Sequence, residues 1–402
     1  GDSEPGSWAT APYYAPGTPE RYDTQKIVSL TSAWKLFETL GGSAQTHVHL
    51  GIFDTGLFSD QTKPCNYGFN PYPHRSDAGG FDLYFYDGSI WSRPATLADW
   101  TDRGDKTPAQ CEAHGAQGAS DGHGTACVGI IGAVVPAPAG VTATKANGAL
   151  SGFARAGIDT GMPFVMDVWS TRLPSRAPLT RQQMYDAIGR ADGVKQVFGV
   201  NWGGLVNSAT PGDPFDAASN TVWIVAAHNY GVDAVTYWPS RDATQSNHLI
   251  VGAVQAPNDN RWDTGGQFAS NYGVSVGVAA PTHVYTLCGS QKHFRDVGGT
   301  SSATPQVIAV AGFVRWARPD LQSASVVSLI KQTGVDVNPF GDWHRYWYEL
   351  PRIDWMRLLT SEPMLATFNP EIRPLLLIGD RKPGASSLTA WPIDPQTGGK
   401  QG

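Results

Sequence analysis

Three short segments of the sequence carry side chains that together could perform nucleophilic catalysis. Asp54 ends an apolar run, His123 stands between two glycines, and Ser301 follows a Gly-Thr pair. A serine hydroxyl is a poor nucleophile until a base takes its proton as it attacks. An imidazole can accept that proton near neutral pH and deliver it to a leaving amine, while a carboxylate holds the imidazole in the required tautomer. These residue types therefore predict acyl transfer through a serine nucleophile.

Each of the three segments also has an ordinary structural explanation. An aspartate at a strand end often serves in a turn, Gly-His-Gly is common in turns, and Gly-Thr-Ser before an apolar run is a typical helix N-cap. The occurrence of all three in the order Asp, His, Ser, with long separations, favours catalysis, because this is the chain order of one known type of serine triad.

The elements expected around these residues are buried strands that alternate with helices. The apolar run 48–53 predicts a buried strand that ends at Asp54. The same patterns predict strands near 81–86, 163–169, 195–201, 221–227, 248–254 and 274–279, and helices near 31–40, 123–135, 180–191, 300–317 and 322–333. Such alternation predicts an α/β fold with a mainly parallel central sheet and helices on both faces. Active sites in these sheets lie beyond the carboxyl ends of the strands.

Charge and hydropathy narrow the class of partners. The formal net charge is −6 and no run of Lys and Arg occurs, so we expect no nucleic-acid partner. The longest apolar stretches, such as 126–135, are far shorter than the ~20 residues of a membrane helix, so we expect no membrane insertion. The chain opens on Gly1 and not on Met, as a mature product or a trimmed chain would, and we expect a secreted protein. We also expect a monomer.

The three segments resemble the motifs of the subtilisin-like serine proteases, the subtilase family (peptidase family S8). Gly299 to Pro305 is similar to the nucleophile motif Gly-Thr-Ser-x-Ala-Thr-Pro, and His123-Gly124-Thr125 resembles the family's His-Gly-Thr motif. The resemblance covers roughly residues 45–335. It implies a subtilisin-like three-layer fold and an endopeptidase that cleaves proteins or peptides, with Asp54, His123 and Ser301 as its triad. It also implies that the Asn229 amide joins the Ser301 backbone N–H in the oxyanion hole.

The same resemblance implies a set of substrate-binding residues. Gly203 and Gly204 would belong to a backbone strand that pairs with substrate, and Ser170, in the segment 168–171, to a second such strand, although Trp169 could equally be core. Ala226, Ala227 and His228 would line the pocket for the residue before the scissile bond. His228 stands where the family normally keeps glycine. Its side chain predicts either a narrowed or polarised pocket that prefers small or acidic residues, or a structural role pointing aside, and the residues leave both open.

The cysteines and the oxygen ligands give further expectations. Cys65 and Cys111 bracket the long insertion between Asp54 and His123, which favours a disulfide between them. Cys127 is expected to be a buried free thiol, as in some relatives, and Cys288 is unassigned. The chemistry needs no cofactor. The resemblance leaves a structural Ca²⁺ open, with Asn147 and Asp60 as the oxygen donors available and the metal ligands unknown.

The chain is expected to divide into three parts. Residues 1–24 read as an N-terminal arm, 25–338 as the catalytic domain, and 339–402 as a C-terminal extension packed on it. Two alternatives to hydrolysis keep the same scaffold, namely a peptide ligase or macrocyclase that uses the same acyl-enzyme, and a catalytically inactive binding protein.

Overall fold

A single large sheet organises the protein. The computed structural model describes residues 28–30, 33, 36, 48–56, 80–86, 91–92, 123–132, 164–171, 179–191, 196–201, 203–206, 215, 220–255, 259–287, 294–337 and 350–365. Over these residues eight strands run parallel side by side, namely β2 (Gly80–Tyr86), β4 (Phe164–Ser170), β1 (Val48–Asp54), β5 (Val197–Val200), β7 (Val222–Ala226), β9 (His248–Gln255), β11 (Val276–Pro281) and β15 (Pro351–Arg352). Three short strands pair antiparallel at its margins, namely β3 (Trp91–Ser92) with β2, β10 (Asn260–Arg261) with β9, and β14 (Val335–Asp336) with β15. The mainly parallel sheet predicted from the alternating pattern is confirmed.

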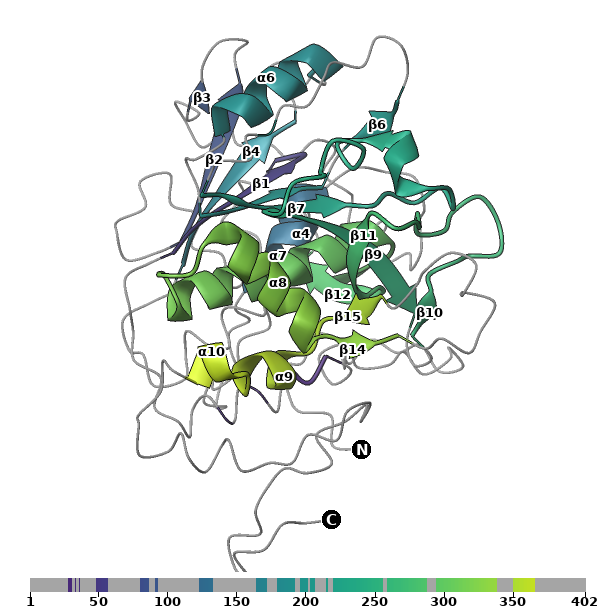
Figure 1. The fold of residues 1–402 in the computed structure, drawn as a ribbon. Helices are drawn as coiled ribbons and strands as arrows, with labels where there is room; N and C mark the ends of the chain where they lie inside the picture. The colour runs from purple at the N-terminus through teal and green to yellow at the C-terminus, as the bar shows by residue number, and fades with distance from the viewer. Residues whose placement is uncertain are drawn as a thin grey trace, which may run out of the picture.

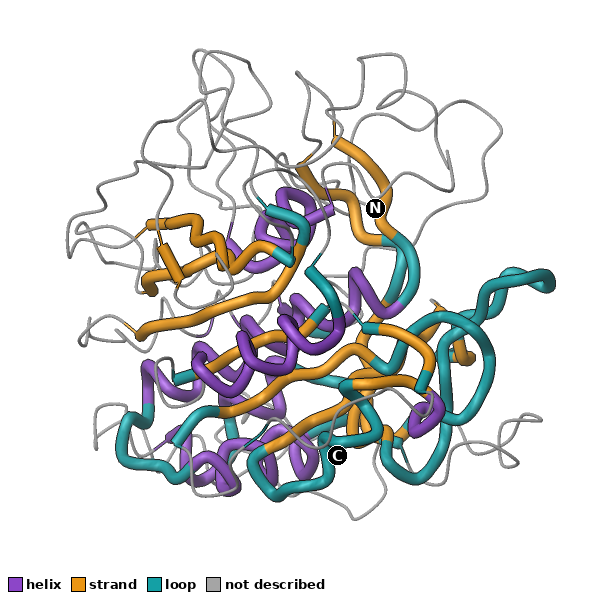
Figure 2. The backbone as a smooth tube through the Cα atoms, turned by 90° about the horizontal axis from the view of Figure 1, so that it is seen from above, coloured by secondary structure: helices purple, strands orange, loops and turns teal. Residues whose placement is uncertain are grey.

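Helices cover both faces of this sheet. Three helices lie on one face, α4 (His123–Gly132), α7 (Thr300–Ala317) and α8 (Ser323–Thr333), and α6 (Arg181–Ala191) lies on the other, as Figure 1 shows. Figure 2 shows from above that the long helices, in purple, run beside the orange strands. No helix in the described part of the chain is long and apolar enough to span a membrane.

The strand alternation explains why the sheet needs helices on both sides. In β1, Leu50 and Ile52 pack in the core formed with α4, α7 and α8, while Phe53 packs in the second core with α6. Successive side chains of a strand point to opposite faces, so a strand that is apolar at nearly every position must be covered twice. The three-layer α/β fold follows from this pattern.

The segment after the last long helix also belongs to this body. Strand β15 adds to the sheet beside β11, with Ala279 opposite Arg352, and leads into α9 (Trp355–Leu359) and α10 (Glu362–Leu365). Trp355 is buried and its ring lies 5.7 Å from that of Phe313 in α7. Residues 350–365 of the predicted extension therefore pack on the body, while its remaining residues, 339–349 and 366–402, lie outside the described part of the chain. The predicted arm 1–24 lies outside the described residues.

Candidate active site

The candidate site lies at the carboxyl ends of two neighbouring parallel strands. Asp54 is the last residue of β1, and Asn201 follows β5, where its backbone N–H donates to the Phe53 carbonyl at 3.2 Å. Strand β4 lies on one side of β1 and β5 lies on the other side. Between β4 and β5 the chain therefore crosses from one side of β1 to the other. At such a switch point the connections diverge and leave space above the sheet, which is where α/β proteins bind their ligands.

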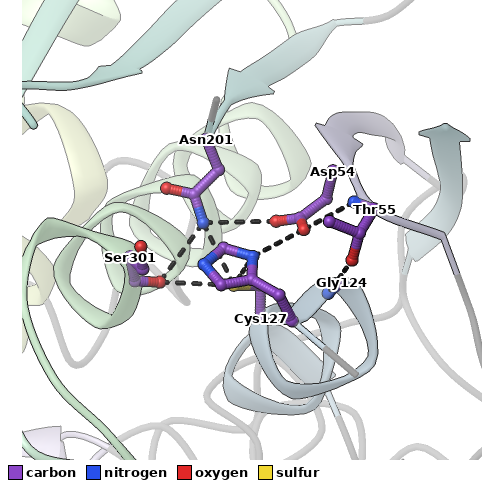
Figure 3. Close-up of polar contacts among 7 residues, drawn as sticks. Asp54, Thr55, Gly124, Cys127, Asn201 and Ser301 are labelled. Atoms are coloured by element: carbon purple, nitrogen blue, oxygen red, sulfur yellow. Dashed lines mark hydrogen bonds and ion pairs between the residues drawn. The ribbon is translucent and has the colours of Figure 1, made fainter. Parts of the chain in front are cut away.

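Asp54 and His123 form a short hydrogen-bonded pair above this edge. His123 is the first residue of α4, and its Nδ1 lies 2.6 Å from Asp54 Oδ1. A carboxylate only accepts hydrogen bonds, so Nδ1 carries the proton and Nε2, which carries none, can act as a base. The Thr55 hydroxyl accepts from the Gly124 N–H at 2.9 Å, which ties the end of β1 to the start of α4 (Figure 3).

The surroundings of Asp54 keep its carboxylate ionised. Burial by itself would raise the pKa of Asp54, because it penalises the charged form. Attraction to His123 opposes this, together with hydrogen bonds from His123, from the Thr55 N–H at 2.7 Å and from Cys127, and the pKa is held below its ordinary value of 3.8. Asp54 is therefore a buried anion that can stabilise a positive charge on the imidazole.

Ser301 is the second residue of α7 and its backbone carbonyl is held from outside the helix. In an α-helix this carbonyl would accept from the N–H of residue 305, but residue 305 is proline and has none. Instead the carbonyl accepts from Asn201 Nδ2 at 3.2 Å and from Cys127 Sγ at 3.3 Å. Figure 3 shows Asn201 between Asp54 and Ser301. The proline of the nucleophile motif thus frees the acceptor that ties Ser301 to the Asp54 side of the site.

Asn201 is the site residue that the sequence prediction did not name. Its Nδ2 lies 3.3 Å from Asp54 Oδ2 and 3.0 Å from Cys127 Sγ, in addition to its bond to Ser301. The available signal was the one that marked Asp54, a polar residue directly after a buried strand. The bonds themselves join residues more than 70 positions apart, and no local pattern reveals them.

Cys127 lies beside His123 and Ser301 as a buried thiol that forms no disulfide, as predicted. Its Sγ is 3.6 Å from His123 Nδ1, so His123 and Ser301 both contact this one sulfur. In the described part of the chain, Asp54, His123 and Cys127 are the group that could hold a metal ion, with ligand atoms within 4.8 Å of one another. Sulfur and imidazole ligands suit soft metals and not Ca²⁺. The residues predicted for a disulfide and for calcium lie outside the described residues, namely Cys65, Cys111, Asn147 and Asp60. The unassigned Cys288 lies outside them too.

Asn229 lies at the head of α7 with its side chain fixed. Its Oδ1 accepts from the Thr300 N–H at 2.9 Å and from the Thr300 hydroxyl at 3.0 Å. Gly299 adopts a φ of 73°, and a Cβ there would stand 2.7 Å from Asn229 Oδ1, so glycine is required for this approach. Because Thr300 donates to the amide oxygen, the NH₂ group is the part of the Asn229 side chain that can donate to a ligand at the head of α7. The first N–H groups of α7 add to this donor set.

Two segments face each other beside these donors. Strand β6 (Gly204–Leu205) pairs antiparallel with β8 (Tyr237–Trp238) along one edge, and no strand in the described residues pairs with its other edge. Ala226 ends β7 and is buried, as is Ala227, and the next residue, His228, lies against Gly203. An open backbone edge can accept an extended peptide by adding a strand. The predicted placement of Gly203 and Gly204 therefore fits the geometry.

The expectation for Ser170 is wrong. Ser170 ends β4, which pairs with β1 on one side and β2 on the other, opposite Asp54 and Phe85. Because β1 and β2 occupy the two edges of β4, a substrate peptide cannot pair with this strand at Ser170. Trp169 is plain core, since its ring packs edge-on against Phe53 at 5.7 Å.

Known proteins are similar to this chain in sequence. The sequence profile of the subtilase family matches residues 46–347. The curated Subtilisin-like protease 2 of Pseudogymnoascus destructans is 29% identical over 279 residues, which cover 67% of this chain and 60% of that protein, so the chain spans about three fifths of the relative's length. The crystal structure of a cold adapted subtilisin-like serine proteinase aligns with a TM-score of 0.44 at 16% identity, over 76% of this chain and 88% of that chain. Because the family profile matches well over half of this chain, the chain belongs to the subtilase family.

Proposed function

We propose that this protein is a secreted serine endopeptidase that hydrolyses peptide bonds of proteins through an acyl-enzyme intermediate. The observation that carries the proposal is the assembly of Asp54, His123 and Ser301 at one sheet edge. The imidazole of His123 is hydrogen-bonded to the buried carboxylate of Asp54 at 2.6 Å. The sulfur of Cys127 contacts both this imidazole and the backbone carbonyl of Ser301. Membership of the subtilase family supports the same reaction.

The residues divide the reaction into two balanced halves. Ser301 Oγ attacks the carbonyl carbon as His123 Nε2 takes its proton, and the resulting oxyanion accepts from the Ser301 N–H and the Asn229 amide. When the carbon–nitrogen bond breaks, His123 returns the proton to the leaving amine. Water then attacks the acyl-enzyme with His123 again as base, which releases the acid and restores Ser301. Throughout, Asp54 stabilises the imidazolium.

Labelling with a fluorophosphonate tests the nucleophile directly. We expect wild type to be labelled at Ser301 and the Ser301→Ala variant not to be labelled, with both proteins folded by circular dichroism. A folded wild type that remains unlabelled would contradict the proposal. Incubation with a peptide then identifies the acceptor of the acyl group, since hydrolysis gives two products whose summed mass exceeds the substrate by one water. Joined peptides would instead show transfer to an amine.

The extracellular setting is part of the same proposal. A bridge between Cys65 and Cys111 belongs to an oxidising compartment and would leave Cys127 and Cys288 as thiols. Thiol titration of the unfolded, unreduced protein should therefore give two thiols per chain. Four thiols would exclude the bridge and remove its support for secretion.

A further inference from the structure

The proposed chemistry limits where one substrate side chain can lie. The proposed reaction places the scissile carbonyl carbon of the substrate at Ser301 Oγ and its oxygen at the Asn229 amide. The side chain of the residue before the scissile bond is attached to the Cα that is bonded to this carbonyl carbon. It must therefore lie beside Asn229, along the segment that ends β7, and face the segment that begins β6. These two segments, 226–228 and 203–204, are named here the pocket walls.

The imidazole of His228 spans the gap between the pocket walls. A Cβ placed on Gly203 would stand 2.5 Å from both Cε1 and Nε2 of His228, and 2.1 Å from the Trp238 carbonyl oxygen. The edge of the ring thus touches the main chain of the opposite wall, and only glycine fits at position 203. His228 and Gly203, which belong to opposite pocket walls, are therefore in direct contact.

Two tyrosine rings continue outward from the imidazole of His228. The Tyr237 ring lies 5.2 Å from that of His228, tilted by 34°, and the Tyr230 ring stacks on Tyr237 at 4.8 Å with an angle of 4°. The three rings form a continuous stack, which we call the aromatic stack. Packed rings at these separations attract one another, so swinging His228 outward would break favourable contacts.

The backbone of His228 is also held in place. Its φ is 73°, in the left-handed region that disfavours residues with a side chain. Its carbonyl accepts from the Asn271 N–H at 2.8 Å, and the carbonyl of Asn229 accepts from the Ala269 N–H at 3.2 Å. A strained conformation persists where its surroundings determine it, and such positions concentrate at functional sites.

The ring carries no charge at neutral pH. Burial lowers the pKa of His228 to about 4, and a hydrogen bond with the Trp238 backbone opposes this only in part. An acidic substrate residue would therefore find no cation in the pocket. Of the two preferences predicted from the sequence, the acidic one loses its physical basis.

We infer that His228 occupies the pocket for the residue before the scissile bond, so that the enzyme cleaves after glycine, alanine or serine and rejects large side chains. The inference rests on the proposed function. It assigns His228 as a specificity-determining residue, with Gly203 and the aromatic stack holding its ring in the pocket.

Matched peptides that differ only at this position test the inference. We expect wild type to show a kcat/KM at least about 100-fold higher for alanine than for phenylalanine, since each misfitting carbon in a tight pocket changes discrimination by roughly 10- to 200-fold. His228→Gly should raise kcat/KM for phenylalanine at least tenfold relative to alanine. His228→Asn, which is smaller and tolerates the left-handed backbone, should give an intermediate ratio.

Folding and catalysis are controlled separately. Glycine relieves the strain at a φ of 73°, so His228→Gly should fold, which a thermal melt checks. His248→Asn is the matched control, because His248 is also buried with a pKa lowered to about 4 but lies at the opposite end of the sheet, at the start of β9. Its alanine-to-phenylalanine ratio should equal that of wild type.

The outcomes separate the inference from the proposed function. A labelled wild type that cleaves after phenylalanine as readily as after alanine overturns the inference alone. The same holds for a folded His228→Gly variant whose profile is unchanged. A folded wild type that fluorophosphonate does not label overturns both.

Discussion

Asn229 is expected to contribute separately to stability and to catalysis, and the two contributions can be measured apart. Its Oδ1 accepts both the backbone N–H and the hydroxyl of Thr300, which is only 1% exposed. Replacement by alanine leaves this buried N–H without its acceptor, so the free energy of unfolding should fall by about 1–3 kcal/mol. The same replacement removes one oxyanion donor, which is worth about 3 kcal/mol in the transition state.

The kinetic consequence is a loss of kcat of about 100- to 1,000-fold with little change in KM, because the donor acts on charge that develops only in the transition state. Asn229→Asp keeps an acceptor for Thr300 but replaces the donor with a negative charge. It should lose less stability than Asn229→Ala and at least as much kcat. Thr300→Val removes only the hydroxyl bond, so it should cost about 1 kcal/mol of stability and less than tenfold in kcat.

The assay uses a peptide with alanine before the scissile bond for kcat and KM. Urea unfolding is measured in the Ser301→Ala background, where self-digestion cannot occur. If Asn229→Ala loses stability while kcat stays within threefold of wild type, Asn229 only caps α7 and the reasoning on the oxyanion is refuted.

Three further results are expected from residues around the site and the core. Mercuric ion should inhibit wild type by binding Cys127 beside His123, and Cys127→Ala should retain measurable activity that mercuric ion does not inhibit. The pKa values of His228 and His248 are lowered to about 4 from 6.5, so the stability that their neutral forms contribute is complete above pH 6.5 and is lost as pH falls toward 4. Urea midpoints of His228→Asn should therefore fall less steeply over this range than those of its parent. Trp355→Ala should lower the free energy of unfolding by about 3–5 kcal/mol, and a change below 1 kcal/mol would show that residues 350–365 are not part of the core.

Local patterns were sufficient to predict most elements of the fold. The expected helices at 180–191, 300–317 and 322–333 match α6, α7 and α8 to within one residue at each end. This works because helix and strand periodicity, glycine stops and apolar runs are properties of adjacent residues. The predicted helix at 123–135 matches α4 as far as Gly132, and residues 133–135 lie outside the described part of the chain.

The short strands were not predicted, for a physical reason. Strand β15 has two residues and exists because Arg352 pairs with Ala279 of the sheet. The hairpin of β12 (Val284–Leu287) and β13 (Phe294–Val297) likewise depends on pairing between strands. Elements of this length carry no periodic signal, and the hydrogen bonds that create them join distant parts of the chain.

The sequence by itself determined the candidates for catalysis, because Asp54, His123 and Ser301 lie in contiguous motifs whose chemistry can be read residue by residue. Only the tertiary structure decided their setting. It placed Ser170 inside the sheet, brought Asn201 to the Ser301 carbonyl, and laid the His228 ring against Gly203. These outcomes depend on which strands become neighbours and on where each side chain points. Both are decided by the packing of segments that are far apart in the chain.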